Sequence, residues 1–334
     1  MTPSSLARAT LAALTTLSCL AANATTYHLT DLGPDTYGAA INANGDVAGA
    51  VDVYQGTSPW VGVWHAATGT WTRLGDGDMV DGINDHGTVV GARPGKTIQG
   101  VRWGADGHPH VVKIEGSISS ILLALANDGR TYGYWTDAAL AYHPFKLEHG
   151  TVVDLGCPTA AGCIPVATSR AGLVAGHIYA DGDPLGTYQA GVYRDGAWTN
   201  LGTLGGINSY ANAVNANGRV VGASNYRPKS AAVHAFMWHD GGVMQDLHTA
   251  GGPYSSAEAV ADDGTVAGAT SDAAGTYGAA LWFAGTWTFL APLVDNLDGF
   301  DLADAQGLTK DGRILVNAYK DNFAHAVILT PVAP

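Results

Sequence analysis

A glycine that closes a tight turn recurs along this 334-residue chain at nearly constant intervals. Successive copies are 42, 42, 43, 46, 46 and 48 residues apart. A period in the forties is typical of a β-propeller, in which each repeat is one four-stranded blade. Repetition therefore favours one domain of seven units, although the chain is longer than most single domains. The turn glycines are Gly45, Gly87, Gly129, Gly172, Gly218, Gly264 and Gly312.

The fifth unit shows the pattern most clearly. An alternating stretch from Tyr210 to Asn215 leads into the turn Asn217-Gly218, and a β-branched pair follows, which predicts a hairpin. Two more apolar runs, Ala235 to Trp238 and Val243 to Leu247, complete four short antiparallel strands. Abundant glycine (45 residues) and few charged residues (13%) suit an all-β domain with many tight connections.

Two positions keep their character in every unit. Five residues before the turn glycine only Ala or Gly occurs, which we attribute to crowding of the innermost strands near the axis. The third strand ends in a large apolar residue, which we interpret as core filling between blades rather than as an aromatic platform for a sugar. These residues are Trp64, Trp103, Leu147, Tyr193, Trp238, Trp282 and Leu329.

The two ends of the chain complete one unit between them. Residues 27–33 (Y-H-L-T-D-L-G) match the fourth-strand pattern, whereas the last unit stops after its third strand, Ala326 to Leu329. Pairing of the N-terminal strand with the C-terminal three would close the ring and leave no unpaired sheet edge. We therefore predict an all-β fold over residues 25–334, a single seven-bladed β-propeller of four-stranded antiparallel blades.

The N-terminus has the features of a secretory signal. Leu6 to Leu20 form a short apolar stretch around the single basic residue Arg8, and Ala22-Asn23-Ala24 supplies the small residues that a signal peptidase needs. We predict a signal peptide over residues 1–24 and a secreted or periplasmic mature protein. Lipidation at Cys19 is the alternative, although the residues before it match a lipidation motif poorly.

Two cysteines remain in the mature chain. Cys157 and Cys163 lie six residues apart in one short loop. A metal site needs more ligands, and redox exchange usually needs a C-x-x-C spacing. In an exported chain we therefore expect these two cysteines to form a disulfide.

Charge and motifs exclude several classes of protein. The formal charge of −13 becomes −14 once Arg8 is lost, and such a surface repels nucleic acid. No basic amphipathic stretch indicates a membrane surface, so no membrane insertion is expected. The sequence has no G-x-S-x-G elbow, no H-E-x-x-H and no phosphate-binding glycine loop. We therefore expect no cofactor, and we expect a monomer.

The histidines and acidic turns could suggest metal binding. His143, His234 and His325 occupy equivalent third-strand positions, but in different blades, so they are too far apart to share an ion. We expect each imidazole to satisfy a local backbone group. Turns such as Asn42 to Gly45 and Asp262 to Gly264 have too few carboxylates for calcium and are interpreted as plain tight turns. The sequence thus predicts no metal site.

One position of the repeat varies in chemistry. Six residues before the turn glycine four of the seven units carry a polar side chain, and two residues earlier some units carry Tyr or Asp. These two positions share one face of a strand because side chains alternate. If that face points to the axis, polar groups gather at the mouth of a central channel. There they either hydrogen-bond one another and water or bind a ligand. The candidates are Asp81, Tyr210, Asn212, Glu258, Asp304 and Gln306.

The fifth unit also resembles a known family. The segments L-G-T-L-G-G (Leu201 to Gly206), S-Y-A-N-A-V-N-A-N-G-R-V-V-G-A-S (Ser209 to Ser224) and H-A-F-M-W (His234 to Trp238) are similar to the HAF-repeat family of extracellular proteins. The tripeptide H-A-F at the start of the last segment changes to H-P-F at His143 and to H-A-V at His325, and the other units lack it. The resemblance implies export and a repeat fold, and it brings no catalytic residues.

Three functions fit these observations. The first is an exported binding or interaction module that holds a protein or glycan through loops on one face of the propeller. The second is a lyase or hydrolase acting on an extracellular polysaccharide at the channel mouth, with Asp81 and Glu258 as acid/base or metal-binding carboxylates. The third is a lectin with one site in each groove between blades, which the unequal loops disfavour.

Overall fold

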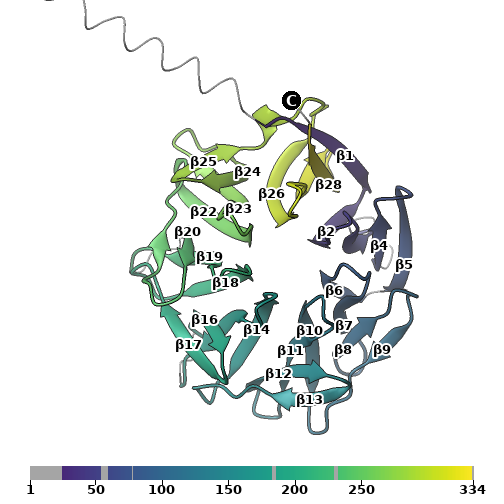
Figure 1. Ribbon diagram of the computed structural model, residues 1–334, viewed down its shortest axis with the longest axis vertical. Helices are drawn as coiled ribbons and strands as arrows, with labels where there is room; N and C mark the ends of the chain where they lie inside the picture. The colour runs from purple at the N-terminus through teal and green to yellow at the C-terminus, as the bar shows by residue number, and fades with distance from the viewer. Residues whose placement is uncertain (1–24, 54–58, 77, 183–185, 229–231, 333–334) are drawn as a thin grey trace, which may run out of the picture.

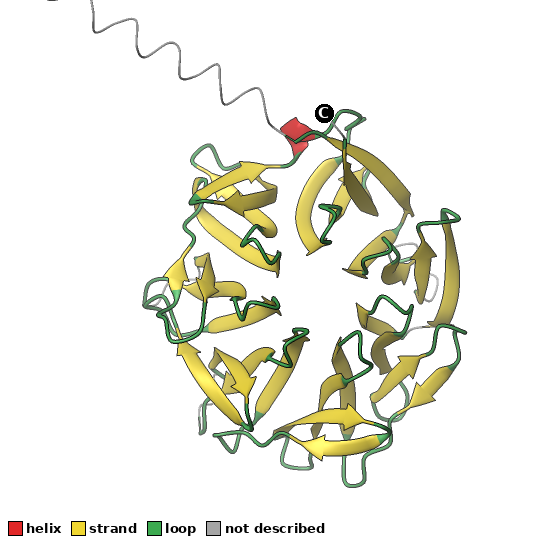
Figure 2. Ribbon diagram, in the orientation of Figure 1, coloured by secondary structure: helices red, strands yellow, loops and turns green. Residues whose placement is uncertain are grey.

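The strands form seven four-stranded antiparallel sheets arranged around a central axis (Figures 1 and 2). The computed structural model describes residues 25–53, 59–76, 78–182, 186–228 and 232–332. The predicted signal peptide, residues 1–24, lies outside these ranges. Within them no helix is long and apolar enough to cross a membrane. The prediction of seven four-stranded blades is confirmed.

The blades follow the chain in order, and each runs from the innermost strand outward. Blade one comprises β2 (Thr36–Ile41), β3 (Val47–Val51), β4 (Trp60–His65) and β5 (Thr70–Asp76). Blade two comprises β6 (Met79–Ile83), β7 (Val89–Arg93), β8 (Gln99–Trp103) and β9 (Pro109–Val111). Blade three comprises β10 (Ser119–Leu125), β11 (Thr131–Thr136), β12 (Tyr142–Glu148) and β13 (Thr151–Asp154). Blade four comprises β14 (Cys163–Thr168), β15 (Val174–Tyr179), β16 (Tyr188–Arg194) and β17 (Ala197–Gly202). Blade five comprises β18 (Ser209–Val214), β19 (Val220–Asn225), β20 (Val233–Trp238) and β21 (Gln245–Asp246). Blade six comprises β22 (Gly251–Val260), β23 (Val266–Asp272), β24 (Tyr277–Phe283) and β25 (Thr286–Phe289), and the 3₁₀ turn η1 (Ala291–Leu293) follows it. Blade seven comprises β26 (Asp301–Leu308), β27 (Ile314–Lys320), β28 (Phe323–Pro331) and β1 (Tyr27–Pro34).

Blade seven closes the ring as the sequence predicts. Strand β1 pairs antiparallel with β28, with Leu29 opposite Leu329 and Asp31 opposite Val327. In Figure 1 the N-terminal β1 lies outside the C-terminal β28. Leu29 and Leu329 belong to one buried cluster, so the closing strand contributes to the core as well as to the sheet.

The core lies between neighbouring blades. The rings at the ends of the third strands are mostly enclosed: Trp103 is fully buried, and Trp64, Trp238 and Trp282 are less than 10% exposed. Their interpretation as core residues is confirmed. Apolar clusters of this kind supply the main favourable term in folding.

Each innermost strand carries a β-bulge at the same position of the repeat, and β22 and β26 have a second irregularity nearer their starts. The register of all seven inner pairs shifts at this point, so one residue of the inner strand has no partner across the ladder. This residue lies six positions before the turn glycine, which is the position of variable chemistry. The bulge residues are Ala39, Asp81, Leu123, Val166, Asn212, Glu258 and Gln306.

The turns connect neighbouring blades. Gly45 and Gly264 have φ of +89° and +95°, a conformation that favours glycine. The Asn84 side chain accepts hydrogen bonds from two backbone N–H groups of its own turn and donates to Ala126 O of the next blade. Asn215 repeats this arrangement with Ala261 O, at 2.8 Å. The interpretation of these segments as tight turns is confirmed.

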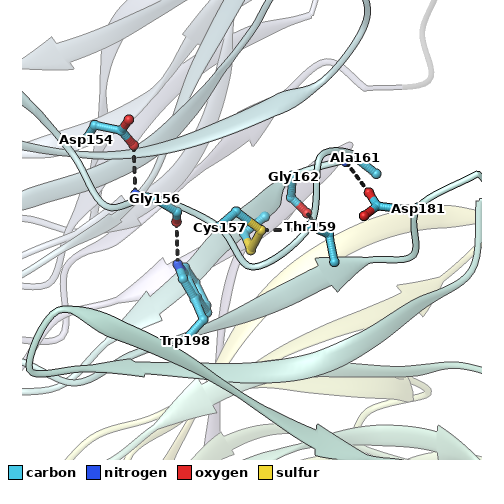
Figure 3. Close-up of a disulfide and its surroundings, with 9 residues drawn as sticks. Asp154, Gly156, Cys157, Thr159, Ala161, Gly162, Asp181 and Trp198 are labelled. Carbon is cyan, nitrogen blue, oxygen red and sulfur yellow. Dashed lines mark hydrogen bonds between the residues drawn. A yellow bond between two sulfur atoms is a disulfide. The ribbon is translucent and has the colours of Figure 1, made fainter.

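The predicted disulfide is present between blades three and four (Figure 3). Cys157 and Cys163 have Cα atoms 5.7 Å apart. Beside them Trp198 Nε1 donates to Gly156 O at 2.9 Å, and Ala161 N donates to Asp181 Oδ1 at 2.8 Å. The disulfide thus fixes the connection that leads into the innermost strand of blade four.

Candidate functional site

The candidate site lies at one end of the ring. We call the end at which the innermost strands begin the loop face, and the end that carries the turn glycines the turn face. Strands β18, β22 and β26 are the innermost strands of three consecutive blades (Figure 1). These strands bring Tyr210, Glu258 and Asp304 close together. Burial, and then the charges of groups that include both carboxylates, raise the pKa of Tyr210 to about 12.

Glu258 is held by hydrogen bonds from two directions. Asn212 Nδ2 of the preceding blade donates to Glu258 Oε2 at 2.8 Å and to Ala257 O at 3.0 Å. Ser256 Oγ, two residues away on the same strand, donates to Glu258 Oε1. Burial raises the pKa of Glu258, whereas the bond from Ser256 lowers it. The bulge residues of two neighbouring blades, Asn212 and Glu258, are therefore joined directly by a side-chain hydrogen bond.

Asp304 has a different environment. Its Oδ2 accepts a hydrogen bond from Gln306 Nε2 at 2.7 Å, and its Oδ1 is buried with no hydrogen-bond partner in the described part of the chain. Burial, and then the charge of Glu258, raise the pKa of Asp304 to about 7. An ionised carboxylate with one oxygen unpaired is costly to bury, so the neutral acid is favoured below that pH.

A cavity of about 570 Å³ opens beside Asp304. It lies among blades six, seven and one, and three exposed tyrosine rings form much of its wall. Tyr37, Tyr277 and Tyr319 are 44%, 52% and 48% exposed, so part of each residue is open to solvent at the cavity. Burial of the hydroxyl, and then the charges of Asp304 and Glu258, raise the pKa of Tyr277 to about 12. We call this cavity the loop-face pocket, defined by Tyr37, Tyr277, Asp304, Gln306, Asn317 and Tyr319.

An arc of aromatic side chains continues from Tyr210 around the loop face. The His177 ring lies 6.4 Å from that of Tyr210 and 5.5 Å from that of Tyr188, measured between centroids. Burial lowers the pKa of His177 to about 4, so this imidazole is neutral at physiological pH. The arc then passes through three more tyrosines at centroid spacings of 5.4, 4.8 and 5.4 Å. They are Tyr179, Tyr142 and Tyr134.

The candidates chosen from the sequence do not include this arc beyond Tyr210, or four of the six residues that define the pocket. Tyr134 and Tyr179 lie on second strands, and Tyr142, Tyr188 and Tyr277 begin third strands. The search along the innermost strand could not find them. A count of tyrosines at the loop-face end of every strand would have done so, because in antiparallel blades the second strand ends where the first and third begin.

Asp81 stands apart from the other predicted residues. It lies on β6, across the ring from β22 in Figure 1, and its side chain is exposed. Enclosure by the surrounding blades raises the pKa of Asp81 to about 7, and water at its exposed surface weakens that effect. No charge of Glu258 or Asp304 contributes to this shift. The structure thus gathers Tyr210, Asn212, Glu258, Asp304 and Gln306, but it does not pair Asp81 with Glu258.

The three repeat histidines were expected to bond backbone groups, and this expectation was wrong. Each imidazole contacts a carboxylate instead. His143 Nε2 lies 3.0 Å from Asp137, and His325 Nδ1 lies 2.8 Å from Asp31. His234 Nδ1 lies 3.0 Å from both oxygens of Asp246. Asp31 and Asp246 stand at equivalent fourth-strand positions, so a histidine–aspartate pair joins the third and fourth strands of two blades.

Comparison with known proteins supports the fold alone. No family model matches the sequence, and no curated protein matches it. The β-propeller domain of the trilobed protease from Pyrococcus furiosus is 10% identical with a TM-score of 0.53, over 91% of this chain and 95% of that one. A structure described for two prolyl endopeptidases is 13% identical with a TM-score of 0.55, over 93% and 51%. The acylaminoacyl peptidase of Pyrococcus horikoshii is 8% identical with a TM-score of 0.50, over 89% and 52%. This chain spans about half the length of the last two.

Asp304 should make stability depend on pH. Its pKa is raised from 3.8 to about 7, so the folded state binds the proton more tightly than the unfolded chain. This contribution is complete below pH 3.8 and is lost as pH rises to about 7. We therefore expect Asp304→Asn, which cannot ionise, to raise the free energy of unfolding by about 1–3 kcal/mol at pH 8 and far less at pH 4.5. Urea unfolding at both pH values tests this.

Asp301→Asn is the matched control, because Asp301 is an exposed carboxylate on the same strand. Its effect should be equally small at both pH values. An Asp304→Asn variant whose stability relative to the parent protein does not change between pH 4.5 and 8 would contradict the buried, neutral carboxyl.

Proposed function

We propose that this protein is an exported binding module whose loop-face pocket holds a glycan. The observation that carries the proposal is the combination in one cavity of partly exposed tyrosines with a buried carboxyl and two amides. Sugars present apolar C–H faces that stack on aromatic rings, and hydroxyl groups that bond to carboxyl and amide side chains. A volume of about 570 Å³ lies in the range of small-ligand sites.

Charge narrows the class of glycan. Asp301 and Asp304 line the pocket and supply acceptors, and no cation lines it among the described residues, so a polyanionic sugar would find acidic groups and no compensating positive charge. A neutral or amino-substituted oligosaccharide suits this site better. The disulfide and the expected signal peptide both agree with export. Membership in the HAF-repeat family is part of the same proposal.

One observation favours a catalytic alternative. Glu258 and Asp304 belong to one electrostatic cluster, and the pKa of each carboxyl is raised. A protonated acid beside a second carboxyl is the arrangement that polysaccharide hydrolases use, and a lyase could use the adjacent Tyr277 and Tyr210 hydroxyl groups. The fold neighbours give no support to either chemistry, because they share only the architecture.

A thermal-shift and calorimetric screen tests the proposal. The mature chain is titrated with neutral, amino and acidic oligosaccharides, alongside Tyr277→Ala and Tyr254→Ala. Tyr254 is 43% exposed but lies outside the pocket, which makes it the matched control. A ligand at about 100 times its dissociation constant stabilises a fold by about 2.7 kcal/mol. We expect a neutral or amino sugar to do so for the parent and Tyr254→Ala but not for Tyr277→Ala.

The outcomes separate the two functions. Binding without any product supports the module, whereas turnover that disappears in Glu258→Gln supports the enzyme. If no sugar binds, or if Tyr277→Ala binds as tightly as the parent, the pocket is not a glycan site.

A further inference from the structure

A second group of potential ligands lies away from the loop-face pocket, at the outer edge of blade five. His234 begins β20, Asp246 ends β21, and His248 follows two residues later. One ligand atom from each side chain can be chosen so that all three lie within 4.8 Å of one another. His234 Nδ1 is 3.0 Å, and His248 Nδ1 3.3 Å, from Asp246 Oδ2. Around a tetrahedral Zn²⁺, neighbouring ligand atoms are about 3.3 Å apart, given bonds of about 2.0–2.1 Å.

The surrounding contacts hold the His234 ring and the backbone of His248 in place. The His234 ring stacks on Tyr226 with centroids 3.8 Å apart. His248 N donates to Asp246 Oδ1 at 2.7 Å, and Trp287 Nε1 donates to His248 O at 3.2 Å. Because these groups are already ordered, less conformational entropy is lost when an ion arrives.

Comparison among the blades shows what is particular to this one. The residue two positions after the fourth-strand Asp or Asn is glycine with positive φ in blades three, four and seven, namely Gly156, Gly202 and Gly33. Blade five places His248 there, at φ +57°, a conformation that non-glycine residues rarely adopt. Blade seven keeps the pair His325–Asp31 but has Gly33 in place of the second imidazole. Blade five therefore adds a third potential ligand, His248, to a histidine–aspartate pair that blade seven has without it.

We propose that His234, Asp246 and His248 form a binding site for a divalent transition-metal ion, with Zn²⁺ as the best match. Two imidazoles and one carboxylate are the nitrogen and oxygen ligands that Zn²⁺ prefers, and calcium prefers oxygen alone. His248 is 78% exposed in its side chain, so the ion can enter from solvent. Three protein ligands leave a fourth position for water or for an atom of a bound molecule.

Isothermal titration of the mature, tag-free, chelator-treated protein with Zn²⁺ tests the site. We expect one ion per chain, a rise in melting temperature with Zn²⁺, and visible absorption typical of tetrahedral coordination when Co²⁺ replaces it. His248→Gly introduces the residue found in blades three, four and seven and should fold at least as well as the parent in chelator. It should weaken Zn²⁺ binding by at least roughly tenfold.

Two further variants sharpen the result. His239→Ala removes an exposed histidine outside the cluster and should bind like the parent. Gly33→His adds the missing imidazole beside His325 and Asp31 and should create a second, weaker site. The absence of Zn²⁺ binding by the parent, or parental affinity in His248→Gly, would overturn the proposal.

Discussion

Removal of residues 25–34 should abolish cooperative folding of this protein. These residues contain β1, which buries Leu29 and Leu32 to about 5% exposure and closes the ring against β28. Loss of two buried leucines costs roughly 2 kcal/mol each, and the freed edge of β28 loses its ladder. The total approaches the 5–15 kcal/mol that typically separates the folded from the unfolded state. Circular dichroism and urea unfolding of the truncated chain measure the effect.

Point variants of the same strand serve as the matched test. Leu29→Asp places a charge in the buried cluster and should lower the free energy of unfolding by about 4 kcal/mol or more. His28→Ser changes an exposed neighbour and should cost far less, because its solvent-exposed contact with Asp295 contributes little to stability. A truncated chain that unfolds at the parental urea concentration would show that the ring does not depend on this closure.

Gly222→Ala should lower the free energy of unfolding by about 3–5 kcal/mol and distort the candidate site. A Cβ at Gly222 would lie 1.9 Å from Tyr210 O and 2.9 Å from Ala211 Cα, both backbone atoms that cannot move without the strand. Tyr210 lies two residues before the bulge at Asn212, so relief of the clash must shift the strand that carries the site. Urea unfolding measures the loss of stability, and ligand titration measures the loss of binding.

Gly95→Ala is the control for that substitution. Its φ is not in the left-handed region, and the nearest atom to an added Cβ is Thr97 O at 3.4 Å. Its stability should stay within about 0.5 kcal/mol of the parent. Equal effects of the two substitutions would mean that the close approach between β18 and β19 tolerates a methyl group.

The repeat explains why so much of the fold was predictable. A period in the forties, a turn glycine and an apolar end to the third strand recur in seven copies, so errors in one copy are corrected by the others. The closing strand was predictable because residues 27–33 complete an unfinished unit. The disulfide followed from having only two cysteines in the predicted mature chain, six residues apart.

The site was predictable only in part. Five of the six candidates do meet, because side chains two residues apart on the innermost strand share a face and consecutive blades are neighbours. Asp81 does not meet Glu258, since distance around a ring depends on which blade each residue occupies. The pocket tyrosines come from several different strands, and the cluster of His234, Asp246 and His248 joins segments 12 and 14 residues apart.

The amino-acid sequence determined the number of blades, their four-stranded order and the closure of the ring, because these depend on periodicity and on local turn chemistry that every copy repeats. Only the tertiary structure decided where the chemistry lies. The bulge in each innermost strand interrupts the ladder at one residue. The close approach of Gly222 to Tyr210 and Ala211, beside the bulge at Asn212, is a contact between strands. Burial of Asp304 and its interaction with Glu258 likewise arise only when three blades pack around one axis. Such effects depend on distances between segments far apart in the chain, and no local pattern encodes those distances.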